Sequence, residues 1–114
     1  MKDMPIPHCQ TEGEVLTMPA DRILEGNPVF TLWELNEKPV ATGFWAATPG
    51  VHRMLRDDVT WEQCLILEGL VEITEDGKDP IRYAPGDVLT IPPLFKGTWR
   101  TIEAARKYYV TVTG

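Results

Sequence analysis

Short apolar runs, separated by prolines and glycines at close intervals, dominate the pattern along the chain. No stretch keeps the 3.6-residue apolar period of an amphipathic helix over enough residues to indicate one. The runs are bounded by turn residues, which favours strands. Nine strands are predicted, at residues 29–35, 40–46, 51–55, 61–67, 70–74, 81–83, 87–91, 98–102 and 107–112. This many short strands are typical of a β-sandwich or β-barrel.

Alternation within the strands indicates which faces meet solvent. Apolar and polar positions alternate along 71–74 and 108–112, so each of these strands is predicted to have one wet face. The run at 64–67, Cys-Leu-Ile-Leu, is apolar on both faces. It predicts a central strand with one side in the core and the other against a second sheet or a partner subunit. Turns are predicted at 75–78, where Asp-Gly supplies a positive φ, and at 84–87.

The length and the charge of the chain limit the classes of protein to which it can belong. A chain of 114 residues is expected to form one domain. Its net charge of −6, with no Lys/Arg cluster, argues against nucleic acid and anionic membrane as partners. No apolar run approaches the roughly eighteen residues of a membrane helix, and the first residues lack the apolar stretch of a signal peptide, so a cytoplasmic location is expected. Cys9 and Cys64 lie too far apart to indicate a disulfide framework, and Cys64 is interpreted as a small buried hydrophobe.

The most informative motif is Glu-Gln-Cys-Leu-Ile-Leu-Glu-Gly at 62–69, followed by Gly-Asp-Val-Leu-Thr-Ile-Pro at 86–92. The first has the spacing with which the first cupin motif ends, a glutamate and, after six intervening residues, a glycine. The second reproduces the first half of the second cupin motif. With Gly-Thr-Trp at 97–99 and Arg-Lys-Tyr-Tyr at 106–109, the chain resembles the unannotated, RmlC-like cupins related to ureidoglycine aminohydrolase.

This resemblance implies an all-β fold, the cupin-type double-stranded β-helix or jelly-roll barrel, with little helix. The single domain 1–114 would consist of an N-terminal tail and edge segment at 1–27 and a barrel core at 40–113. A homodimer is expected through the apolar outer face of a sheet and the N-terminal segment. The aromatic residues that suggest it are more than one small core needs: Phe30, Trp33, Phe44 and Trp45.

Most of the metal ligands of the family are missing from the matching positions. The His-x-His pair falls on Arg56 and Asp58, the glutamate on Glu62, and the second-motif histidine on Gly97, so Glu62 alone is retained. A transition metal usually requires three or four His, carboxylate or thiolate ligands. No tightly bound manganese, iron, nickel or zinc is therefore expected. Strand alternation leaves one alternative ligand set: His52, Asp58, Glu62 and Cys64.

A metal-free site has its own candidate chemistry in the mouth of the barrel. Glu62 and Asp58 would act as catalytic acid and base or as polar anchors, and Arg56 would clamp an anion or carboxylate. The candidate ligand-binding residues are His52, Cys64 and Trp99. The alternatives remain open: a salt bridge that fills a dead site, an ordinary surface or hydrogen-bonded histidine, a tryptophan that plugs the lumen, or a one-residue shift that turns Leu55 and Asp57 inward.

Two classes of function fit these residues. The first is an enzyme of the lyase, isomerase or hydrolase type that acts on a small polar or anionic metabolite, including a ureido compound, in the barrel lumen. The second is a non-catalytic module that binds or senses a small molecule and whose metal site has decayed. The absence of three of the four family ligands weakens the first class as a metalloenzyme.

Overall fold

The computed structural model describes residues 12–37 and 39–113. The prediction for Cys9 lies outside these residues. The described residues are almost entirely extended, with one short 3-10 helix, η1, at Ala20–Arg22. The strands are β1 (Glu14–Leu16), β2 (Ile23–Gly26), β3 (Phe30–Asn36), β4 (Val40–Ala47), β5 (Gly50–Leu55), β6 (Thr60–Glu75), β7 (Ile81–Tyr83), β8 (Val88–Ile91) and β9 (Lys96–Thr113). The all-β prediction is confirmed, and within the described residues no helix is long and apolar enough to cross a bilayer.

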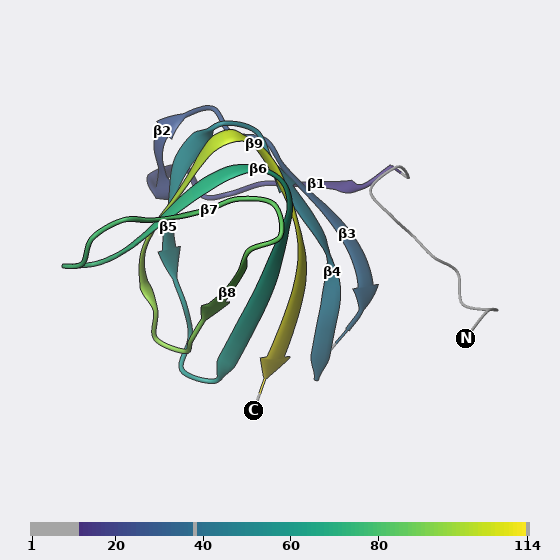
Figure 1. Cartoon of the computed structure of the whole chain (residues 1–114). Coiled ribbons are helices and arrows are strands. Elements are labelled where there is room, and N and C mark those ends of the chain that lie inside the picture. Colours follow the sequence, from purple (N-terminus) through teal and green to yellow (C-terminus); the bar gives the residue numbers. More distant parts are fainter. Residues whose placement is uncertain (1–11, 38, 114) are drawn as a thin grey trace.

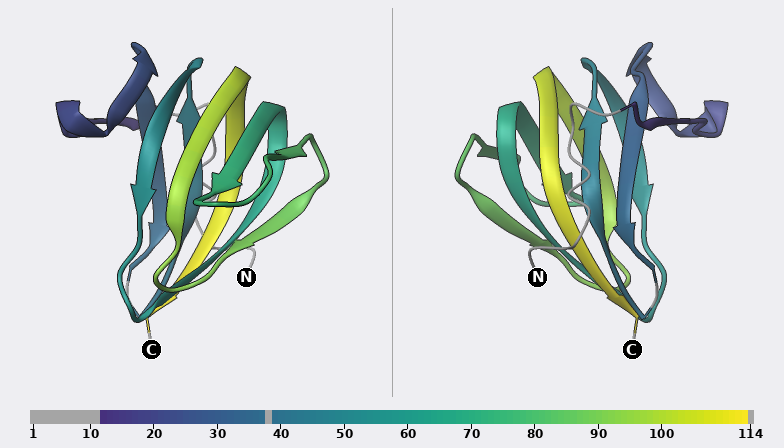
Figure 2. Two further views of the ribbon diagram at one scale, coloured as in Figure 1. Left: turned by 90° about the vertical axis from the view of Figure 1, so that its left-hand side faces the viewer. Right: turned by 90° about the vertical axis from the view of Figure 1, so that its right-hand side faces the viewer.

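The strands form one antiparallel sheet that curls around its own inner face (Figure 1). Its main path runs β1-β3-β4-β9-β5-β2, and β6 pairs with β9, β8 and β7. Figure 2 shows two walls of strands that converge at one end and diverge at the other. The space between the walls is where inward-facing side chains of β5, β6 and β9 meet.

Two long strands replace four predicted short ones. The predicted strands at 61–67 and 70–74 are halves of β6, and those at 98–102 and 107–112 are halves of β9. The β6–β9 register shifts between Ile66 and Val71, where the ladder bends. Gly69 lies at this bend with φ +85°, and a Cβ there would collide with the backbone of Ala104. Gly69 therefore lets the strand bend without ending. In the sequence it interrupts the apolar pattern, so one bent strand was predicted as two short ones.

The N-terminal edge strands were not predicted individually. β1 and β2 have three and four residues, and they lie in the segment expected to be a tail and edge. β1 pairs with β3, and β2 pairs with β5. Runs this short carry too little alternation to predict a strand, so pairing with a neighbouring strand determines their conformation.

The two predicted turns are present. Lys78 N–H donates to the carbonyl of Glu75, and Gly77 between them has φ +79°. In the second turn, Asp87 N–H donates to the carbonyl of Ala84, while the Asp87 carboxylate accepts the N–H of Ala84. Turn chemistry was therefore sufficient to place both reversals of the chain.

The inner face of the sheet holds the hydrophobic core. Cys64 and Ile66 of β6 are each 1% exposed, as is Trp99 of β9. On the opposite face of β6, Leu65 is half-buried and Leu67 is 37% exposed. The remaining buried members of the core cluster are Met54, Val71, Ile73, Leu89, Ile91, Ala105 and Tyr109. Residues 64–67 therefore have one face in the core, as predicted.

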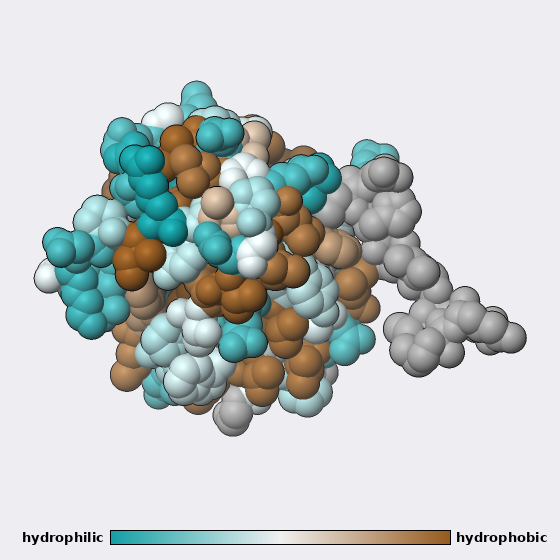
Figure 3. Space-filling model, in the orientation of Figure 1, coloured by the Kyte–Doolittle hydropathy of each residue, from teal (hydrophilic) through white to brown (hydrophobic). Residues whose placement is uncertain are grey.

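The outer face of the sheet also carries apolar side chains. Strand register puts Trp61 of β6 beside Val112 of β9, and Val112 beside Val40 of β4. These three side chains are 53%, 42% and 39% exposed, respectively. Figure 3 shows one face of the molecule, on which hydrophobic residues gather in patches among hydrophilic ones. Of the four aromatic residues that suggested a homodimer, Phe30 is buried, whereas Phe44 packs against Tyr108 on the outer face.

Candidate functional site

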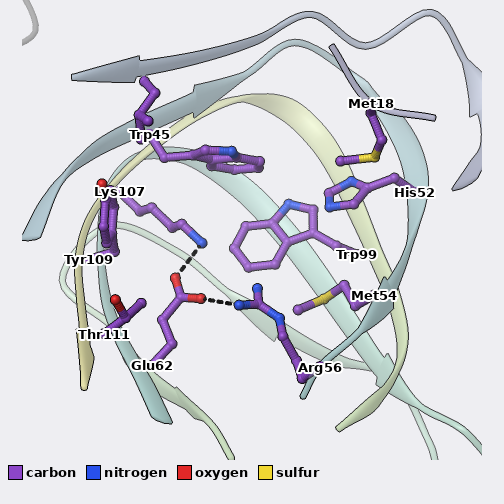
Figure 4. Close-up of a pocket in the computed structure, with 11 residues that line it drawn as sticks. Met18, Trp45, His52, Met54, Arg56, Glu62, Trp99, Lys107, Tyr109 and Thr111 are labelled. Carbon is purple, nitrogen blue, oxygen red and sulfur yellow. Dashed lines mark hydrogen bonds and ion pairs between the residues drawn. The ribbon is translucent and has the colours of Figure 1, made fainter. Parts of the chain in front are cut away.

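A pocket of about 240 Å³ lies between the two walls of the barrel (Figure 4). Strands β5 and β9 supply six of its eleven lining residues, because every second side chain of a strand points to the same face. Its lining residues are Met18, Leu32, Trp45, His52, Met54, Arg56, Glu62, Trp99, Lys107, Tyr109 and Thr111. Four of these have acidic or basic side chains: His52, Arg56, Glu62 and Lys107.

Strand pairing places the polar groups at fixed positions around the pocket. His52 on β5 is paired with Trp99 on β9, and Glu62 on β6 is paired with Thr111 on β9. Lys107 of β9 is paired with Trp45 of β4. Side chains of paired residues lie on the same face of a sheet, so all of these residues face the interior.

Glu62 is the centre of the charged cluster. Its Oε1 lies 2.8 Å from Nη1 of Arg56, and its Oε2 lies 2.9 Å from Nζ of Lys107. Only 5% of its side chain is exposed. Burial alone would raise the pKa of Glu62, but the adjacent charges of Lys107 and Arg56 lower it to about 2. The carboxylate is therefore ionised and held by two cations.

Lys107 is a buried charge enclosed by two tryptophan rings. Its Nζ lies 4.6 Å from the ring centroid of Trp45 and 4.5 Å from that of Trp99. Burial opposes its charge, but the carboxylate of Glu62 outweighs that effect and holds the pKa of Lys107 above its ordinary value. The ammonium is thus stabilised by one carboxylate and by the faces of two indole rings.

His52 is buried against aromatic rings. Its ring is stacked 6.2 Å from that of Trp99 and meets Phe30 edge-on at 5.0 Å. Burial, together with the charges of Lys107 and Arg56, lowers the pKa of His52 from 6.5 to about 4. The imidazole is therefore neutral at neutral pH and forms an uncharged polar part of the wall. The alternative of an ordinary surface histidine does not match this position.

Two predicted site residues do not reach the pocket. β5 ends at Leu55, so strand alternation stops before Asp58, which is exposed and does not line the pocket. Cys64 is buried behind Glu62, where its Sγ donates to Oε2 of Glu62 at 3.0 Å. Burial raises the pKa of the Cys64 thiol to about 12, so it stays protonated. Asp58 and Cys64 are therefore not the pocket groups that the sequence suggested.

Trp99 serves both of the roles considered for it. Its side chain belongs to the core cluster and is 1% exposed, and its indole N–H donates to Oγ1 of Thr101 at 3.1 Å. The same ring also lines the pocket between His52 and Lys107 (Figure 4). It fills the barrel on one side and forms a wall of the pocket on the other.

The metal implied by the cupin resemblance does not fit the donor set of this pocket. The guanidinium of Arg56 and the ammonium of Lys107 contact both oxygens of Glu62, where a metal would need them. At Gly97, a Cβ would collide with the carbonyl of Thr74 and the ring of Phe95, so no histidine side chain fits there. Residues 12–37 and 39–113 contain no group of three His, Cys, Asp or Glu side chains suited to a metal, the alternative set included.

Sequence reasoning missed Lys107, the second cation of the cluster. Lysine is usually a surface residue, and the predicted strand 107–112 was read as having one wet face. Lys107, Tyr109 and Thr111 all line the pocket, so that face is directed inward. The signal was the period of two that joins Lys107 to the buried Tyr109.

Comparison with known proteins gives one match to a family model, that of the EutQ-like cupin domain, over residues 34–109. Among solved structures, an ethanolamine utilization protein Q from Salmonella typhimurium LT2 is 22% identical, with a TM-score of 0.66 over 74% of this chain and 69% of that one. Ectoine synthase from P. lautus is 15% identical, with a TM-score of 0.72 over 96% and 78% of the two chains.

A third structure, a protein of unknown function from Pseudomonas syringae pv. tomato, is assigned to the DUF861 family. It is 18% identical, with a TM-score of 0.77 over 90% of this chain and 45% of that one. At such identities these structures share the fold of the chain and say nothing further about it. No curated protein matches the sequence significantly.

Proposed function

The chain belongs to the EutQ-like cupin family, and from that premise we propose that its barrel pocket binds a small anionic metabolite through Arg56. The observation that carries the proposal is that two cations, Arg56 and Lys107, share one carboxylate, Glu62. With His52 neutral, these groups leave the pocket with an excess of one positive charge. A small carboxylate would neutralise it.

Arg56 is the cation that a ligand can engage. Its side chain is 29% exposed, compared with 7% for Lys107. Among the described residues its guanidinium makes one ion pair, through Nη1, which leaves its other N–H donors available. Because Lys107 still neutralises Glu62, Arg56 can turn toward a ligand without leaving a buried carboxylate unpaired. Its planar fork matches a carboxylate in two charge-assisted hydrogen bonds.

The size of the pocket limits the ligand to a small metabolite. About 240 Å³ would hold roughly eight water molecules, at about 30 Å³ each in the liquid. Indole, phenol and thioether side chains form most of the remaining wall, so the ligand exchanges water for apolar contacts as well as for charge. A short carboxylic acid meets both requirements.

The charge states of the pocket residues support ligand binding better than they support catalysis. A general acid or base works best with a pKa near the working pH. The pKa of Glu62 is about 2 and that of Cys64 is about 12, so neither group exchanges a proton readily near neutral pH. Asp58, the other proposed acid or base, is exposed outside the pocket. A lyase, isomerase or hydrolase would have to rely on His52.

The relationship to ureidoglycine aminohydrolase-related cupins stays a proposal that the motif at 62–69 supports. Two structural neighbours are named for ethanolamine utilization and for ectoine synthesis. Those names differ, so they support small-molecule handling in this fold without favouring one substrate. A ureido acid also carries the carboxylate that Arg56 would bind.

We also propose that the chain forms a homodimer through the outer face of the sheet. The face continues across three strands, from Val40 through Val112 to Trp61, which are 39%, 42% and 53% exposed. Large contiguous apolar surfaces usually mark interaction sites, and most homo-oligomers use a two-fold interface. Phe44 and Tyr108 extend this face on β4 and β9.

An NMR titration of the wild-type chain tests the binding proposal. Uniformly ¹⁵N-labelled protein is titrated with straight-chain carboxylates of two to six carbons, and with their amides as uncharged controls of the same shape. The expected result is saturable shifts at the backbone amides of the pocket strands for the acids and none for the amides. Equal responses to acid and amide, or none to either, would contradict the proposal.

A further inference from the structure

We propose that the ligand of this pocket is a small monocarboxylate whose far end carries an uncharged hydrogen-bonding group, such as a hydroxyl or carbonyl, and that His52 binds that group. This inference rests on the proposed function, since it takes the carboxylate to be held at Arg56. It adds a second contact point and, with it, the chemical class of the ligand.

The pocket has two polar ends with an apolar middle. Arg56 and Glu62 form the charged end, and His52 forms the other, next to Met18 (Figure 4). His52 and Arg56 are four residues apart along β5 and its continuation, so their Cα atoms are about 13 Å apart at about 3.3 Å per residue. Met54 lines the pocket midway along this stretch. A ligand that touches both ends must therefore be elongated, with an apolar centre.

His52 has hydrogen-bonding capacity that nothing else in the described part of the chain uses. Its contacts there are with the rings of Phe30, Trp45 and Trp99, and no hydrogen bond from its side chain joins it to another described residue. Yet it is 7% exposed and lines the pocket. Buried polar groups are nearly always paired, so a neutral imidazole on a pocket wall is suited to a ligand that donates or accepts a hydrogen bond.

The surroundings of His52 select against a charged group at this end. An ammonium group would meet a site that already contains the cations of Lys107 and Arg56, whose charges disfavour protonation of His52 itself. A second carboxylate would lose its water among thioethers and aromatic rings, with a neutral imidazole in place of a cation. An uncharged hydroxyl or carbonyl avoids both costs.

One set of probes with a common spacer tests this inference. 4-Hydroxybutanoate, pentanoate, 4-aminobutanoate and glutarate share one carboxylate and a three-carbon spacer, and differ only in the group at the far end. Isothermal titration of the wild-type chain is expected to give a Kd for 4-hydroxybutanoate at least tenfold lower than for the other three. The same four far-end groups are also tested on spacers one carbon shorter and one carbon longer, so that the result does not depend on one choice of ligand length.

The variant His52→Phe keeps the ring contacts and removes the nitrogens. It is expected to bind 4-hydroxybutanoate and pentanoate equally, with the affinity for pentanoate within about twofold of the wild type. If this variant does not fold, the wild-type series decides alone. Equal affinities for all four far groups in the wild type would overturn the inference and leave carboxylate binding standing. Failure of every carboxylate to bind, at every length, would overturn the proposed function and this inference with it.

Discussion

Nζ of Lys107 lies 2.9 Å from Oε2 of Glu62, and both of these side chains are at least nine-tenths buried. The pair joins β9 to β6, and both residues line the pocket. A buried ion pair is costly to form, and breaking it by removing one partner usually costs more, because the remaining charge has no water. Lys107 therefore has a structural role, because it neutralises Glu62 in the folded protein. Arg56 is left available for a ligand.

Replacing Lys107 by methionine should destabilise the fold. The change removes the ammonium group that lies between the rings of Trp45 and Trp99, and it leaves Arg56 as the one cation beside Glu62. Because that second cation remains, the expected loss lies at the lower end of the ~3–5 kcal/mol seen for broken buried pairs. Urea unfolding followed by tryptophan fluorescence measures it. Lys78→Met is the control, since Lys78 is 69% exposed and its loss should change stability by less than about 0.5 kcal/mol. Equal effects of the two changes would contradict the structural role of Lys107.

Stability should fall in acid in two stages. The folded pKa of His52 is about 4, below its ordinary 6.5, so the fold favours the neutral ring and loses that stability as the pH falls from about 6.5 toward 4. At about 1.4 kcal/mol per pKa unit, this stage is worth about 3 kcal/mol. The folded pKa of Glu62 is about 2, below its ordinary 4.5, so its contribution is lost at lower pH, between about 4.5 and 2.

His52→Phe separates these stages. The variant lacks the titrating imidazole, so its free energy of unfolding should change little between pH 6.5 and 5, where that of the wild type declines. Both proteins should still lose stability below about pH 4.5, because Glu62 is unchanged. Urea unfolding at half-unit intervals of pH provides the measurement. A wild-type profile that is flat above pH 5 would show that His52 does not titrate as its surroundings require.

The protein should hold less than one tightly bound transition metal per chain. Arg56 and Lys107 occupy both oxygens of Glu62, and Gly97 has no space for a histidine. Elemental analysis of protein purified without a histidine tag and dialysed against metal-free buffer checks this directly. Stoichiometric manganese, iron, nickel or zinc that survives dialysis would mean that the cluster rearranges around a metal.

Light scattering during gel filtration should give twice the mass of one chain at micromolar concentration. Trp61→Lys introduces a charge on the outer apolar face and should shift the mass toward that of one chain. Ile81→Lys is the matched control, because Ile81 is 56% exposed on β7, away from that face, and should leave the dimer intact. A wild-type mass of one chain would refute the dimer.

Several features of this fold could be predicted from sequence because they are local. Asp76-Gly77 determines its turn by backbone chemistry, and alternation along β5 places Arg56 in the pocket. The rest depends on contacts between distant segments. Gly69 lets β6 bend where its apolar pattern is interrupted, and Asp58 lies beyond the end of the strand whose alternation was extended to it. The period of two that Lys107 shares with Tyr109 indicates its inward face, but its ion pair with Glu62 and its contacts with two tryptophans depend on distant parts of the chain.

The most direct test of anion binding through Arg56 is the dissociation constant of one short carboxylate, 4-hydroxybutanoate, for three proteins by isothermal titration calorimetry. They are the wild type, Arg56→Met and Arg53→Met. Arg53→Met is the matched control, since it removes the same charge from a position three residues away, where Arg53 pairs with Asp76 on the exterior. A charge-assisted hydrogen bond is worth about 1.5–3 kcal/mol, so Arg56→Met should bind about 10- to 150-fold more weakly, and Arg53→Met within twofold of the wild type. Equal affinities in all three proteins, or no binding by the wild type, would contradict the account.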